Sequence, residues 1–163
     1  EIYTLSLHDA LPICGGIYNG EEMMKILDLG ASAVQLGTKF VTTNECDASE
    51  DFKKSYLNAS ESDIEIIKSP VGLPGRAIAS EFLKRVRDGL EKPKSCPFHC
   101  IETSDYEKSP YCIIIALYNA FIGKLNKGYA FCGRNAFRAD KIITVKETIF
   151  TLMEEMKQAR LKR

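Results

Sequence analysis

The fold is decided by a stretch near the start of the chain, PICGGIYNGEEMMKILDLGASAVQLGT at residues 12–38. Two short apolar runs in it each stop at a turn of small residues, the first at Gly15-Gly16 and the second at Gly37-Thr38. Such runs are typical of buried parallel strands that end in tight turns. The stretch therefore predicts a strand, a crossover helix and a second parallel strand, with both turns at one edge of the sheet.

The crossover helix carries its own start and stop signals. Asn19 is a good N-cap residue, and Glu22 stands three positions later, as a capping box requires. The apolar stripe that follows ends before Gly30, which is a favourable residue just beyond a helix. These signals predict a helix of about two turns between the strands.

The two glycine turns predict a phosphate site. Glycines let backbone N–H groups converge on an anion, a helix N-terminus adds partial positive charge, and the hydroxyl of Thr38 can donate a further hydrogen bond. In (β/α)₈ barrels the loops after the last two strands often form such a site. Either turn alone is weak evidence, and the pair at this spacing favours phosphate over two plain turns.

The rest of the chain is mostly helical by pattern. Helices are expected at about residues 48–58 and 80–91, from Ser109-Pro110 to Gly123, and after an N-cap at Thr144. The helix that ends at Gly123 is apolar nearly all round and should be buried. Residues 69–76 hold two prolines and two glycines and are expected to be irregular. The expected inward faces are Phe82, Leu83, Val86 and Leu90, and in the last helix Val145, Ile149, Leu152, Met153 and Met156.

Composition excludes several classes of function. The 22 Lys and Arg residues balance 22 Asp and Glu residues, so no net field attracts nucleic acid. The longest strongly apolar stretch, Tyr111–Leu117, falls far short of the roughly 20 residues of a membrane span. Six cysteines are too few for a disulfide-stapled domain and no secretion signal precedes them, so we expect a reducing, cytoplasmic setting. Residues 1–12 resemble translated sequencing adapter and are interpreted as a non-native start, which removes His8 from consideration.

At this point a family resemblance becomes visible. The string GGIYNGEEMMKILDLGASAVQLGTKFVTTNECDAS at residues 15–49, followed by SPVGLPGRAI at residues 69–78, resembles the carboxyl-terminal part of the flavin-dependent nitronate monooxygenases, also called 2-nitropropane dioxygenase-like proteins. Flavin-dependent enoyl-ACP reductases share that fold and those motifs. The resemblance covers about residues 12–160 and implies an α/β fold, an FMN-binding (β/α)₈ TIM barrel followed by a mainly helical second domain.

The resemblance also assigns cofactor residues. In the family the matching glycine turns hold the phosphate of FMN, which implies that Gly15, Gly16, Gly37 and Thr38 bind the cofactor here. These are the four positions that the glycine-turn pattern indicates without any family. The domains implied are residues 13–60 as the last strands and helices of the barrel and residues 61–163 as a loop and a mainly helical region.

A complete barrel needs about 250 residues, whereas only two strand-and-turn units are readable in this chain. We therefore expect a carboxyl-terminal fragment that is inactive on its own. The family's histidine base belongs to the absent part, since neither His8 nor His99 matches its motif, and no catalytic residue is assigned.

The resemblance implies a parent enzyme that oxidises alkyl nitronates with O₂ to a carbonyl compound and nitrite. Two alternatives stay open: a flavin- and NAD(P)H-dependent enoyl-ACP reductase, and a non-catalytic module stabilised by a metal. The expected partner is a small-molecule substrate, with no nucleic acid and no membrane, and the oligomeric state is left open.

Three further residues carry open alternatives. Arg76, in the stretch VGLPGRAI, matches a loop near the active-site mouth of relatives and is either an active-site residue or a solvated loop arginine. Gly133 and Asn135, in CGRNAFR, either approach the flavin or form a turn and a cap, and the turn is favoured.

The cysteines in the second half of the chain form a possible metal site. Cys96 and Cys100 make a C-x₃-C pair, with Cys112 and Cys132 further on, which is enough for zinc or an iron–sulfur cluster. Buried apolar cysteines are the more common alternative in intracellular proteins. Ser104 stands where bacterial relatives carry another cysteine, which weakens the metal interpretation.

Overall fold

The structure is a computed structural model that describes residues 12–93, 96 and 107–162. Its strands are β1 (Pro12–Cys14), β2 (Ala33–Gln35), β3 (Ile64–Lys68) and β4 (Pro74–Ile78). Its α-helices are α2 (Gly20–Asp28), α3 (Thr38–Val41), α4 (Glu50–Leu57), α5 (Glu81–Arg87), α6 (Ile113–Phe121) and α7 (Val145–Leu161). Short 3₁₀ turns are η1 (Glu61–Asp63), η2 (Leu125–Lys127) and η3 (Ala136–Arg138). The chain is thus a mixed α/β protein. No helix in the described residues combines the length and the apolar character that a membrane crossing requires.

The chain divides into two compact units. The first joins the described residues up to Cys46 with Gly133–Asn135 and with the described residues from Ala139 onward. The second contains the described residues of Asp47–Cys132 together with Ala136–Arg138. The domains expected at residues 13–60 and 61–163 stay a prediction, and the last helix belongs to the first unit.

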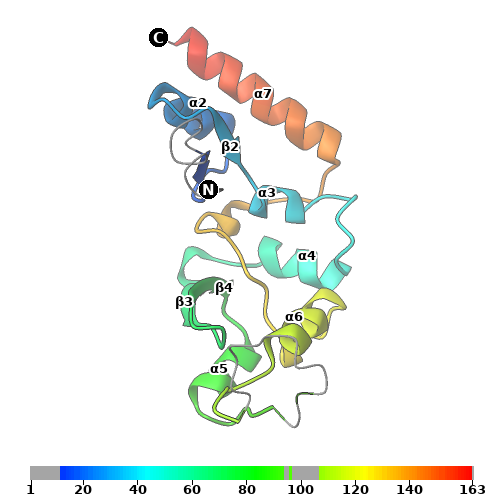
Figure 1. Cartoon of the computed structure of the whole chain (residues 1–163). Helices are drawn as coiled ribbons and strands as arrows, with labels where there is room; N and C mark the ends of the chain where they lie inside the picture. The colour runs from blue at the N-terminus through cyan, green and yellow to red at the C-terminus, as the bar shows by residue number, and fades with distance from the viewer. Residues whose placement is uncertain (1–11, 94–95, 97–106, 163) are drawn as a thin grey trace. The chain divides into compact units, whose positions relative to one another are not determined.

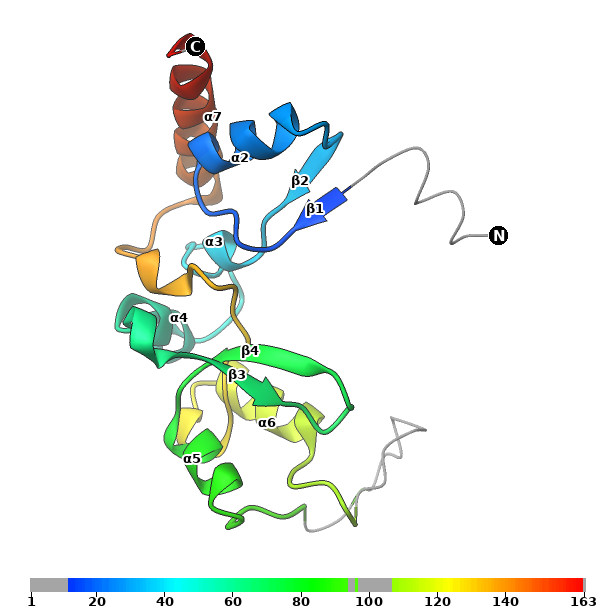
Figure 2. The same cartoon turned by 90° about the vertical axis from the view of Figure 1, so that its left-hand side faces the viewer.

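The strand–helix–strand prediction for residues 12–38 is confirmed in the first unit. Strands β1 and β2 pair in parallel with Ile13 opposite Val34, and α2 connects them (Figure 2). The capping box is complete, since the Glu22 N–H donates to the Asn19 side chain at 2.9 Å and the Glu22 carboxylate accepts from the Asn19 N–H. The first glycine turn follows β1, and Gly37 comes two residues after β2.

The last helix, α7, packs against α2 within the first unit (Figure 1). Its predicted N-cap is confirmed, because Thr144 and Glu147 form a second capping box. The predicted inward stripe is wrong in part: Leu152 is buried, whereas Ile149 and Met153 are each 49% exposed. The buried position one turn before Leu152 is taken by Thr148, whose hydroxyl donates to the Thr144 carbonyl at 3.0 Å.

The second unit holds an antiparallel hairpin that the sequence analysis missed. Strand β3 pairs with β4, so the expectation that residues 69–76 are irregular is wrong from Pro74 onward. Pro74 is tolerated because it is the first residue of its strand, where a proline does least harm to a ladder. Pro70 and Gly72, which has a φ of +85°, lie in the turn that joins the two strands.

Two predictions about helix faces in this unit are also wrong. The helix at Ser80 begins as expected but ends at Arg87, so Leu90 lies beyond it and is 70% exposed. Helix α6 buries Ile113 and Ala116 but exposes Ile114 and Tyr118, so its apolar composition does not bury it on all sides.

Aromatic residues build the core of the second unit. Phe82, Tyr111 and Tyr129 are each at most 4% exposed and pack with Ile67 of β3 and Ala116 of α6. The hydroxyl of Tyr111 donates to that of Tyr129 at 3.2 Å, and burial raises the pKa of both phenols. We call Phe82, Tyr111 and Tyr129 the aromatic core.

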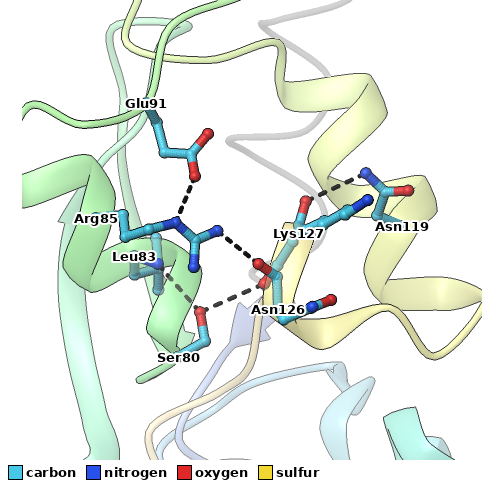
Figure 3. A network of polar contacts seen from close by, with 8 residues as sticks. Ser80, Leu83, Arg85, Glu91, Asn119, Asn126 and Lys127 are labelled. Carbon is cyan, nitrogen blue, oxygen red and sulfur yellow. Dashed lines mark hydrogen bonds and ion pairs between the residues drawn. The ribbon is translucent and has the colours of Figure 1, made fainter.

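A polar network fastens α5 to the segment after α6 (Figure 3). Arg85 donates to the carboxylate of Glu91 at 2.7 Å and to the backbone oxygen of Asn126 at 2.6 Å. Ser80, the N-cap of α5, accepts the Leu83 N–H at 3.2 Å and donates to the carbonyl of Gly128 at 3.3 Å. These contacts stabilise the second unit.

Candidate functional site

The first unit contains a pocket of about 280 Å³ at the two glycine turns. Three segments that are far apart in the sequence line it. They are Gly15, Gly16, Ile17 and Tyr18; Gln35, Leu36, Gly37 and Thr38; and Gly133 and Asn135. All four residues predicted to bind the cofactor phosphate are therefore together, and we call this the glycine pocket.

The glycines of the first turn have a backbone that other residues rarely adopt. Gly15 and Gly16 have φ angles of +89° and +76°, and both are exposed. Because this region of φ is costly for residues with a Cβ, the turn depends on glycine. A Cβ at either position would meet no atom within 4 Å, so the space beside the turn is open.

Gly37 keeps the second side of the pocket open for a different reason. Its φ of −114° is ordinary for any residue, yet a Cβ there would also meet nothing within 4 Å. Glycine at this position therefore leaves room beside the chain rather than permitting an unusual backbone.

Thr38 has its hydroxyl oxygen fixed by a contact from the third segment. The backbone N–H of Gly133 donates to Thr38 Oγ1 at 2.7 Å. A hydroxyl that accepts one hydrogen bond still has its own proton to donate. Thr38 is thus prepared as a donor, in the way that a phosphate oxygen requires.

Asn135 reaches the first turn from the same segment. Its Nδ2 donates to the backbone oxygen of Gly16 at 2.6 Å. Asn135 lies in a turn that leads into η3, in line with the turn interpretation, and both Gly133 and Asn135 also contact the pocket across about 100 residues of sequence.

Lys39 supplies a positive charge that the sequence analysis did not consider. Its Nζ lies 4.1 Å from the centre of the Tyr18 ring, and Tyr18 lines the pocket. A lysine over an aromatic face is attracted by the ring's negative π face. The position of Lys39 directly after the Gly37-Thr38 turn could have indicated a cation near the phosphate site.

The expected contribution of the α2 N-terminus is corrected by the structure. Two of the first three amides of this helix are bonded within the protein: Gly20 N–H donates to Glu155 of α7 at 2.7 Å, and Glu22 N–H donates to Asn19. Their donor capacity is used within the protein. A phosphate would therefore depend on the glycine turns and Thr38.

The residues present fit a phosphate monoester. The pocket offers open space beside three glycines, a hydroxyl donor and a nearby lysine, and none of its lining residues is an acid. Glycine-rich turns of this kind bring backbone N–H groups close to an anion. The 280 Å³ of the pocket hold one end of a larger cofactor rather than all of it.

Arg76 lies in strand β4 of the second unit, and its expected place in a loop is wrong. Its backbone oxygen accepts the Cys132 N–H at 2.9 Å. Burial raises the pKa of the Cys132 thiol to about 11, although the charge of Arg76 opposes the rise. This thiol is therefore protonated at neutral pH.

The metal interpretation gains no support from the described residues. Cys96, Cys112 and Cys132 are free, half-buried thiols, whereas Cys100 and His99 lie outside the described residues. Within the described part of the chain, no three His, Cys, Asp or Glu residues come together as metal ligands would. The metal site of Cys96, Cys100, Cys112 and Cys132 stays a prediction.

A family model described as nitronate monooxygenase matches residues 5–155. The chain belongs to the nitronate monooxygenase family. This is an oxidoreductase family, and membership supports a flavin as the cofactor. The resemblance noted in the glycine-rich stretch is thereby confirmed.

Curated relatives in this family match part of the chain. A probable nitronate monooxygenase of Staphylococcus saprophyticus is 34% identical over 74 residues, which are 45% of this chain and 21% of that protein. A probable nitronate monooxygenase of Staphylococcus aureus strain Newman is 35% identical over 72 residues, 44% of this chain and 20% of that protein. These matches span about a fifth of the relatives' length.

Solved structures match nearly the whole chain. FabK from Thermotoga maritima superposes with a TM-score of 0.76 at 26% identity, over 98% of this chain and 48% of that one. Nitroalkane oxidase from Streptomyces ansochromogenes superposes with a TM-score of 0.70 at 20% identity, over 98% of this chain and 43% of that one. The second likeness shows the fold alone. This member of the nitronate monooxygenase family thus spans about half the length of these structures.

Proposed function

We propose that this chain supplies the phosphate-binding part of an FMN-dependent oxidoreductase that oxidises alkyl nitronates with O₂ to a carbonyl compound and nitrite. The observation that carries the proposal is the glycine pocket, which gathers Gly15, Gly16, Gly37 and Thr38 in a member of the nitronate monooxygenase family. When bound, FMN would supply electron transfer from the nitronate and from there to O₂.

The chain's own residues would hold one end of the cofactor. The two glycine turns bring backbone N–H groups and open space to the phosphate, and Thr38 donates its hydroxyl proton. Lys39 adds positive charge beside Tyr18, which offsets part of the charge of the phosphate. No described residue is assigned as the base that would act on the substrate.

The rest of the flavin site is proposed to come from polypeptide outside these 163 residues. The βαβ segment would form the last two strands of a (β/α)₈ barrel, in line with the 48% of the FabK chain that this chain covers. We use "parent protein" for the longer polypeptide that this implies. The 163-residue chain alone is expected to show no turnover, because most of the walls around the flavin ring are absent.

A second candidate activity is a flavin- and NAD(P)H-dependent enoyl-ACP reductase. The likeness to FabK, with 26% identity over nearly the whole chain, supports this second candidate. Both candidates use the same phosphate pocket, so residues of this chain do not separate them.

The deciding experiment uses the purified parent protein and two reductants. Its flavin is identified by absorbance and mass, and the protein is then mixed without oxygen with propyl-2-nitronate or with NADPH. Loss of flavin absorbance with the nitronate, followed by nitrite release when O₂ is admitted, supports the proposed function. Reduction by NADPH with consumption of an enoyl thioester, and none by the nitronate, would favour the second candidate. A parent protein without flavin would contradict both.

A further inference from the structure

The segment Gly133–Asn135 ties together the two glycine turns of the pocket. Gly133 contacts the second turn through the 2.7 Å hydrogen bond to Thr38, and Asn135 contacts the first through the 2.6 Å hydrogen bond to Gly16. The two contacts connect this segment to turns 95 and 119 residues away in the sequence. Through these two hydrogen bonds the segment Gly133–Asn135 joins the other two segments that line the pocket.

Gly133 approaches Thr38 so closely that a side chain at position 133 would displace Thr38 Oγ1. A Cβ at position 133 would lie 2.8 Å from Thr38 Oγ1, inside the contact distance of a carbon and an oxygen. The N–H of Gly133 occupies one lone pair of Thr38 Oγ1, so the hydroxyl proton must point elsewhere. This contact restricts the rotation of the Thr38 hydroxyl.

Asn135 restricts a peptide group rather than a side chain. Gly15 and Gly16 both have positive φ and lack a Cβ, so the peptide groups of this turn can rotate with little steric cost. In a planar trans peptide the N–H points opposite to the carbonyl oxygen. Holding the oxygen of Gly16 therefore fixes the direction of the N–H of Ile17, which also lines the pocket.

We propose that Asn135 is a positioning residue for the phosphate. It holds the peptide between Gly16 and Ile17 so that the carbonyl oxygen does not turn toward the anion, while Gly133 orients the hydroxyl of Thr38. This inference rests on the proposed function, since it takes the phosphate of FMN as the ligand of the glycine pocket. Asn135 acts through Gly16 and needs no contact with the cofactor.

The test compares FMN with riboflavin, which has the same ring and lacks the phosphate. Affinity of the parent apoprotein for each is measured by quenching of flavin fluorescence, for the wild type, Asn135→Ala and Asn135→Leu. Leucine has the branched heavy-atom shape of asparagine, carries no charge and cannot donate to the oxygen of Gly16. Asn44→Ala is the matched control, because Asn44 is exposed in the same unit and its backbone N–H, which donates to Ile143, is retained.

We expect both Asn135 variants to bind FMN about tenfold more weakly, as the loss of one hydrogen bond implies, and riboflavin within about twofold of the wild type. Asn44→Ala should bind both flavins as the wild type does. Equal losses for FMN and riboflavin would show a general structural role and would overturn the inference, as would unchanged FMN binding. If Asn135→Ala unfolds below the assay temperature, Asn135→Leu decides.

The same titration separates this inference from the proposed function. A wild-type protein that binds FMN no better than riboflavin does not recognise the phosphate, which contradicts the proposed function. A wild type that prefers FMN, with variants that keep the preference, leaves the proposed function intact and rejects the role of Asn135.

Discussion

The glycine pocket of the first unit and the aromatic core of the second use glycine in opposite ways. Around Gly16 and Gly37, a Cβ would meet nothing within 4 Å. Next to the aromatic core, Gly128 is buried, and a Cβ there would overlap the Ala116 carbonyl oxygen of α6. Absence of a side chain leaves space for a ligand in the first region and lets backbone approach backbone in the second.

This difference is informative about function where the backbone does not itself require glycine, as at Gly37 with its φ of −114°. A glycine whose missing side chain would occupy open space has no packing reason to be glycine. A glycine in close contact with a neighbouring backbone, such as Gly128, must be glycine for the chain to pack. The comparison predicts that substitutions in the two regions affect different measurements, ligand binding in the glycine pocket and folding stability in the second unit.

The largest expected effect is Gly128→Val. The new side chain would overlap α6 at Ala116, so we expect the free energy of unfolding to fall by about 4 kcal/mol. Urea unfolding followed by circular dichroism measures it. An unchanged free energy of unfolding would show that α6 can move to accommodate the valine. It would contradict the proposed difference between Gly128 and the glycines of the pocket.

The next effect is Gly37→Val, in the parent protein. The φ of −114° suits valine and the space around it is open, so the melting temperature should change little. The side chain would fill the space proposed for a phosphate oxygen and weaken FMN binding by about 3 kcal/mol or more. Flavin absorbance after gel filtration is the measurement. Stoichiometric FMN in this variant would place the phosphate elsewhere.

A smaller effect is expected for Thr38→Ala. It removes one hydrogen bond to a charged group, which is worth about 1.5–3 kcal/mol of FMN binding. Titration of the apoprotein with FMN and with riboflavin checks it, and only FMN should bind more weakly. A loss larger than that of Gly37→Val would reverse the order expected from the geometry.

The smallest effect concerns the aromatic core and depends on pH. Tyr129→Phe leaves the buried Tyr111 hydroxyl without its partner, which should cost about 1–2 kcal/mol of stability at neutral pH. Burial raises the pKa of Tyr129 above its ordinary value of 10, so the stability that the neutral phenol contributes is present below pH 10 and lost as pH rises further.

At pH 11 the ionisation of Tyr129 in the unfolded state lowers the free energy of unfolding of the wild type by about 1.4 kcal/mol. Tyr129→Phe has no phenol at this position and does not lose this stability. The stability deficit of Tyr129→Phe should therefore disappear near pH 11. Urea midpoints of both proteins at pH 7 and pH 11 check this. A deficit that stays constant would show that Tyr129 ionises normally in the folded state.

Local signals predicted the elements of the first unit well. The capping boxes at Asn19 and Thr144 and the glycine turns after β1 and β2 involve residues within a few positions of one another, so the sequence displays them directly. The hairpin of β3 and β4 was missed because the prolines and glycines of residues 69–76 predict irregular structure when the partner strand is not known. Pairing with β3 is what makes that segment a strand.

The sequence by itself determined the βαβ segment, both glycine turns, the four pocket residues and, through its motifs, the family. Those features depend on short-range chemistry: caps, turns and the spacing of apolar residues. Only the tertiary structure decided that Gly133 and Asn135 join the pocket, that carboxylates already occupy the α2 N-terminus, and that α6 and α7 keep apolar side chains exposed. Those outcomes depend on contacts between residues about 100 or more positions apart, or on which face of a helix finds a partner, and no local pattern contains that information.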